Sequence, residues 1–67
     1  MNLTVNGRTG MYDESCRTLA DLLARPEWTG KLVIVELNGE ITGRDVYGDT
    51  LLNEGDRVEL VHFVGGG

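Results

Sequence analysis

Both ends of the chain have the character of β-strands. Met1, Leu3 and Val5 alternate with polar residues at the start, which is the pattern of a strand with one buried face, and the apolar run 57–64 places Val58, Leu60 and Val64 on one side of a strand. A chain of 67 residues can build only one small core. The two terminal runs therefore predict strands that belong to a single sheet.

A hairpin and a short helix are predicted after the first strand. Asn6-Gly7 is a strong type I′ turn signal, so residues 8–12 are predicted to form the return strand. Thr18 and Asp21 form a capping-box pattern, with Asp in place of the usual Glu, and Pro26 ends the helix. The leucines that follow the cap lie on one helical stripe: Leu19, Leu22 and Leu23. A helix this short is expected to be stable only when its leucines pack on the sheet.

The second half of the chain predicts further strands. The β-branched run 32–37 predicts a central strand buried on both faces. Residues 41–47 are expected to be irregular, with a turn of helix near Arg44, and 49–52 to form a short edge strand. The final strand is predicted over 57–64.

This order of elements predicts an α+β fold of the β-grasp (ubiquitin-like) type. We expect a mixed sheet of four to five strands with one main helix, in which the first and last strands are parallel neighbours at its centre. The β-grasp domain is predicted to span 1–64, and residues 65–67 to form a flexible C-terminal glycine tail.

Charge and cysteine content exclude several classes of protein. Eleven acidic against six basic residues give a net charge of −5, so no basic stripe exists for nucleic acid or an anionic membrane surface. The longest apolar run, 32–35, is far too short to span a membrane, and no signal peptide pattern is present. Cys16 is the only cysteine, which excludes a disulfide scaffold and a thiolate-held iron–sulfur cluster. We expect a cytoplasmic protein.

The residues offer little for catalysis. His62 is the only histidine, it lies within the last strand, and no metal-ligand spacing appears. Cys16 is expected to be a core residue under the helix start, with persulfide or redox chemistry as the alternative. We therefore predict no catalytic residues, no bound metal and no enzyme activity of the chain itself.

The chain ends in Gly65-Gly66-Gly67, which is either a frayed terminus or a thin arm. Extended, three residues reach about 10 Å, and without Cβ atoms they can enter a narrow channel in a partner protein. The arm would present the carboxylate of Gly67. A partner that spends ATP could adenylate this carboxylate, and a sulfur nucleophile could then replace AMP to give a thiocarboxylate.

Three segments resemble the ThiS family of sulfur carriers: 18–23 at the helix start, 37–40 together with Arg44, and 55–67 with its terminal glycines. Gly66 and Gly67 match the family's terminal pair, and Gly65 occupies a variable position. The resemblance implies a ThiF-type adenylyltransferase that uses ATP and Mg²⁺ to adenylate Gly67, and thiazole synthase ThiG as the sulfur acceptor for thiamine biosynthesis. It implies that the carrier itself binds neither ATP nor metal.

Two other functions remain open on the sequence: the small subunit of a molybdopterin synthase, and a β-grasp interaction module with an inert tail. For a carrier, strand parity predicts a docking surface at Val61 and Phe63, on the face of the last strand opposite the helix. The alternative is that the segment 41–52 folds over these two side chains.

Overall fold

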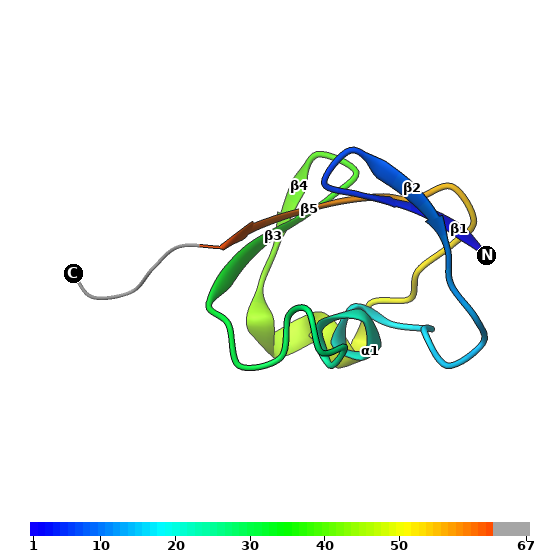
Figure 1. Ribbon diagram of the computed structural model, residues 1–67. Helices are drawn as coiled ribbons and strands as arrows, with labels where there is room; N and C mark the ends of the chain where they lie inside the picture. Colours follow the sequence, from blue (N-terminus) through cyan, green and yellow to red (C-terminus); the bar gives the residue numbers. More distant parts are fainter. Residues whose placement is uncertain (63–67) are drawn as a thin grey trace.

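A computed structural model describes residues 1–62 of the protein. One five-stranded mixed sheet is covered on a single face by two short helical segments (Figure 1). The strand order is β2-β1-β5-β3-β4. The elements, in chain order, are β1 Asn2–Val5, β2 Arg8–Met11, α1 Leu19–Leu23, β3 Val33–Leu37, β4 Glu40–Thr42, the 3-10 helix η1 Arg44–Asp49, and β5 Arg57–His62. This arrangement confirms the predicted α+β architecture with one main helix.

Both hairpins begin with an asparagine in the left-handed region followed by a glycine. Asn6 and Asn38 each have φ of 51°, and Gly7 and Gly39 have φ of 80° and 87°. Positive φ at both central residues is what a type I′ turn requires, and its twist matches that of the strands. The β1–β2 hairpin predicted from Asn6-Gly7 is confirmed, with Val5 opposite Arg8 across the turn.

The first and last strands are parallel neighbours, as predicted. Thr4 pairs with Arg57 and Val5 with Val58, and on its other side β5 pairs antiparallel with β3 along its length. Because β5 is central, its ladder bonds are made on both sides. Its inward positions Val58 and Leu60 are buried in the core.

The helix forms where the capping pattern predicts it. The Thr18 hydroxyl accepts from the Asp21 N–H, and the Asp21 carboxylate accepts from the Thr18 N–H. Leu19 and Leu22 are fully buried, whereas Leu23 packs only at the margin of the core. A five-residue helix is too short to be stable alone, so its packing on the sheet maintains it.

Two strand predictions were wrong. β3 is not buried on both faces: Val35 is 1% exposed but Ile34 is 45% exposed. The helical segments cover only one face of the sheet (Figure 1), and Ile34 lies on the other face.

In the second half of the chain the edge strand is β4, not residues 49–52. Leu51 forms only an isolated bridge with Thr18, and the N–H of Leu52 donates to the Arg17 carbonyl. This segment therefore pairs with the chain entering α1, which allows Leu52 to be buried beneath the sheet. η1 confirms the turn of helix expected near Arg44.

The core lies between the sheet and the helical layer. Its buried side chains are Leu3, Val5, Cys16, Leu19, Leu22, Val35, Leu52, Val58 and Leu60. Within residues 1–62, no helix has the length and apolar character needed to cross a membrane.

Candidate functional site

β5 is the element that leads to the predicted site. Its last described residue, His62, pairs with Val33 at the start of β3. The predicted modification residue Gly67, its neighbours Gly65 and Gly66, and the docking residue Phe63 lie outside the described residues, as does the predicted domain boundary at 64. The structure therefore describes the end of β5, which immediately precedes these residues in the sequence.

A side-chain clamp fixes β5 near that end. The amide oxygen of Asn6 accepts from the Leu60 N–H at 2.7 Å, and the amide nitrogen donates to the Leu60 carbonyl at 3.2 Å. β1 pairs with β5 only as far as Val58, so this amide continues the contact two residues further along β5. The asparagine that shapes the first hairpin thus also positions the strand that carries the C-terminus.

The sheet face opposite the helix carries exposed apolar side chains. Val61 is 52% exposed, and its cross-strand neighbour Ile34 is 45% exposed. Ile41 on β4 lies opposite Glu36, on the same face by strand alternation, and is 75% exposed. We call Val61, Ile34 and Ile41 the open-face patch.

The alternative in which residues 41–52 cover Val61 is wrong. η1 contacts α1, and both lie on the other side of the sheet (Figure 1). Ile34 and Ile41 were not among the predicted docking residues, although strand alternation can place them on the same face as Val61. This alternation was not recognised because the run 32–37 is so apolar that it suggested burial on both faces.

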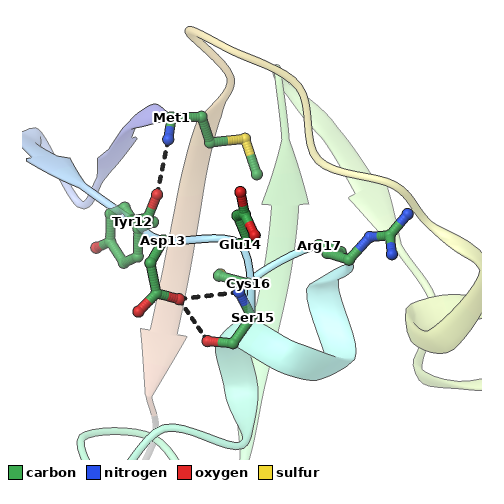
Figure 2. A pocket seen from close by; sticks show the side chains of 7 residues that line it. All are labelled: Met1, Tyr12, Asp13, Glu14, Ser15, Cys16 and Arg17. Carbon is green, nitrogen blue, oxygen red and sulfur yellow. Dashed lines mark hydrogen bonds between the residues drawn. The ribbon is translucent and has the colours of Figure 1, made fainter.

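Cys16 is a core residue. Only 2% of it is exposed, and burial raises the pKa of its thiol. The hollow beside it is lined by Met1, Tyr12 and the loop that leads to α1, and the Asp13 carboxylate there accepts from the N–H and hydroxyl of Ser15 (Figure 2). Burial and a raised pKa both disfavour the reactive thiolate, which favours the structural interpretation of Cys16 over redox chemistry.

Ionisable side chains are dispersed over the described part of the chain. His62 is exposed at the end of β5. Among residues 1–62, no group of three or more His, Cys, Asp or Glu side chains is placed to hold a metal ion.

Comparison with known proteins gives the family. The model of the ThiS family matches residues 3–67. The chain belongs to the ThiS family. The sulfur carrier protein ThiS of Bacillus subtilis (strain 168) is 43% identical over 65 residues, covering 97% of this chain and 98% of that protein. The resemblance noted from the three sequence segments is therefore confirmed.

Solved structures agree on the fold. The crystal structure of the thiamine biosynthesis protein ThiS from Geobacter metallireducens superposes with a TM-score of 0.82 at 39% identity, covering all of both chains. This confirms the β-grasp assignment. A thiazole synthase of Magnetococcus marinus (strain ATCC BAA-1437 / JCM 17883 / MC-1) is 41% identical over 54 residues, which make up 81% of this chain but 17% of that protein. A ThiS-like segment thus occurs inside a much longer thiazole synthase.

Proposed function

We propose that this ThiS-family protein carries sulfur for thiazole formation in thiamine biosynthesis. The observation that carries the proposal is the match to ThiS over nearly the whole chain, up to and including Gly67. The same match, which covers almost all of the Bacillus protein, favours this pathway over molybdopterin synthase and over a simple interaction module.

The proposed chemistry takes place at the carboxylate of Gly67. A carboxylate oxygen attacks the α-phosphorus of Mg²⁺-bound ATP in a ThiF-type adenylyltransferase, which releases pyrophosphate and leaves an acyl-adenylate. Sulfide supplied by a donor then attacks the acyl carbon and expels AMP, and the resulting thiocarboxylate gives its sulfur to thiazole synthase ThiG. Gly65 and Gly66 have no Cβ to obstruct a narrow channel in either partner.

In this scheme the chain is a co-substrate and not an enzyme, and it binds no cofactor of its own. The burial and raised pKa of Cys16 support this assignment, because a protonated thiol is a poor nucleophile. The partners supply the nucleotide, the metal ion and the sulfur source. We also propose a cytoplasmic location, because a single free cysteine fits a reducing compartment.

The open-face patch is the proposed docking surface for the adenylyltransferase. Val61, Ile34 and Ile41 are accessible apolar side chains on adjoining strands, close to the end of β5. Contiguous exposed apolar side chains on a small domain mark partner sites. Phe63, two residues beyond Val61, remains a predicted part of this surface.

Intact mass spectrometry tests the function. The protein is incubated with a ThiF-type adenylyltransferase, ATP, Mg²⁺ and a sulfur source, and we expect the mass change of one oxygen-to-sulfur exchange. Deletion of Gly67, or addition of one residue after it, should abolish the exchange and change the free energy of unfolding by less than about 0.5 kcal/mol. Sulfur acquisition by the extended variant, with no protease present, would contradict the proposal.

Gly66→Val provides a second test within the tail. The branched side chain should obstruct the channel of the adenylyltransferase, so ATP–pyrophosphate exchange should fall while the melting temperature is retained. Normal exchange by this variant would count against a narrow channel.

A further inference from the structure

A cleft lies on the helix side of the sheet, at the end where β5 reaches His62. It has a volume of about 320 Å³. The side chains that define it come from the loop after α1, the start of β3 and η1: Trp28, Lys31, Leu32, Val33, Arg44 and Tyr47. Val33 pairs with His62, so the cleft adjoins the base of the C-terminal segment.

The cleft combines aromatic surface with positive charge. Trp28 and Tyr47 are half-buried and pack against the core, and the Lys31 ammonium lies 5.6 Å from the centre of the Trp28 ring. Lys31 and Arg44 are exposed, and no acidic residue lines the cleft. Within the described residues, neither cation has a carboxylate within ion-pair distance.

A pair of cations at one cleft is unusual for so acidic a chain. The chain carries a net charge of −5 and only six basic residues, yet two of them stand together at this cleft. Cations beside apolar aromatic surface suit an acidic side chain that is flanked by an apolar one. Complementary charge of this kind directs partner choice and association.

We propose that the cleft receives an acidic side chain, with an apolar neighbour, from thiazole synthase. The proposal rests on the carrier function proposed above. An enzyme that takes sulfur from Gly67 must approach the end of the molecule where β5 leads, and the cleft lies there. The Magnetococcus thiazole synthase contains a ThiS-like segment within its own chain, which supports direct contact between the two kinds of domain.

The cleft and the open-face patch lie on opposite faces of the sheet. Val33, in the cleft, shares its strand face with the buried Val35, whereas Val61 belongs to the opposite face. The carrier therefore presents one surface of each kind near the end of β5 at His62. We assign the apolar patch to activation and the cationic cleft to sulfur delivery.

Charge reversal tests the assignment. The double variant Lys31→Glu, Arg44→Glu is compared with wild type by calorimetric titration into purified thiazole synthase. We expect its dissociation constant to rise by about tenfold or more, and its dependence on salt to become weaker. Lys31→Arg with Arg44→Lys retains both charges and should bind thiazole synthase as wild type does.

A matched control variant has the same change in net charge, but its two substitutions lie outside the cleft. Arg8 lies on the edge strand β2, and Arg17 lines the hollow beside Cys16, so neither belongs to the cleft. The variant Arg8→Glu, Arg17→Glu should bind thiazole synthase within about twofold of wild type. Circular dichroism and melting curves confirm that each variant is folded.

Three results would overturn the inference: unchanged binding by the cleft variant, equal loss of binding in the control, or no binding by wild type. If the cleft variant instead loses adenylation and keeps its affinity for thiazole synthase, the cleft belongs to the activating enzyme and the assignment is wrong. Failure of the function itself is seen separately, because wild type would then acquire no sulfur in the mass measurement.

Discussion

Replacing Asn6 separates two contributions that one residue makes to this small domain. Its backbone has φ of 51°, a region that asparagine and glycine tolerate and that costs most other residues about 1 kcal/mol or more. Its side chain also bonds both backbone groups of Leu60 in β5, 54 residues away. Asn6→Gly removes the two hydrogen bonds without backbone strain, whereas Asn6→Ala removes the bonds and adds strain.

The expected magnitudes follow from these contacts. Two hydrogen bonds at about 0.5–1.5 kcal/mol each predict that Asn6→Gly lowers the free energy of unfolding by about 1–3 kcal/mol. Asn6→Ala should lose about 1 kcal/mol more, because alanine is strained at this φ. A domain of this size has roughly 3–5 kcal/mol of stability in total, so the alanine variant should be partly unfolded at 37 °C.

Urea denaturation followed by circular dichroism measures both variants. A matched control is Asn38→Gly, because Asn38 has the same φ as Asn6. The side chain of Asn38 forms hydrogen bonds with Asp56 and Arg57, at the opposite end of β5 from Leu60. Amide hydrogen exchange at Leu60 should accelerate in Asn6→Gly more than in Asn38→Gly. Wild-type stability of Asn6→Gly would refute the clamp, and equal stability of the glycine and alanine variants would refute the strain.

Three other changes test the core, the cap and the docking surface. Leu22→Ala should cost about 2–5 kcal/mol by leaving a cavity, and a small shift in the urea midpoint would show that the core collapses around it. Asp21 has a pKa below its ordinary value of 3.8, because the backbone N–H groups of Arg17 and then Thr18 donate to its carboxylate. The contribution of the ionised Asp21 carboxylate to folding stability is therefore complete above pH 3.8 and is lost as the pH falls through the lowered pKa of the folded state. Asp21→Asn should lower the free energy of unfolding at pH 7 and should make that free energy depend less on pH below about 4. Val61→Ser should weaken binding to the adenylyltransferase by about 1–3 kcal/mol while the melting temperature changes little; a large fall in melting temperature with unchanged affinity would assign Val61 to the fold alone.

Local signals in the sequence specified the turns, the helix cap and the central strand pair. Asn6-Gly7 works at short range because only a few residue types accept positive φ. Thr18 and Asp21 form their reciprocal hydrogen bonds within one turn of helix, so no distant contact is needed. The alternation of Val58 and Leu60 predicted which side of β5 is buried, because a strand has a side-chain period of two.

The wrong predictions concerned segments whose structure depends on partners distant in the sequence. Ile34 and Val35 look alike in the sequence, but only the face that meets α1 is buried. Leu51 and Leu52 fit a strand in the sequence, but in the structure Leu51 forms only an isolated bridge with Thr18, and the Leu52 N–H donates to the Arg17 carbonyl. Neither local propensity nor periodicity contains this information, because both outcomes satisfy the same local pattern.

The sequence alone thus predicted the family and the fold class, both of which the comparisons confirmed. Only the tertiary structure decided which side chains lie near the end of β5 on each face of the sheet. The open-face patch joins residues from β3, β4 and β5, and the cleft joins a loop, β3 and η1. Such surfaces form when the sheet register and the helix packing bring distant segments together, so their composition cannot be read from any single stretch of the chain.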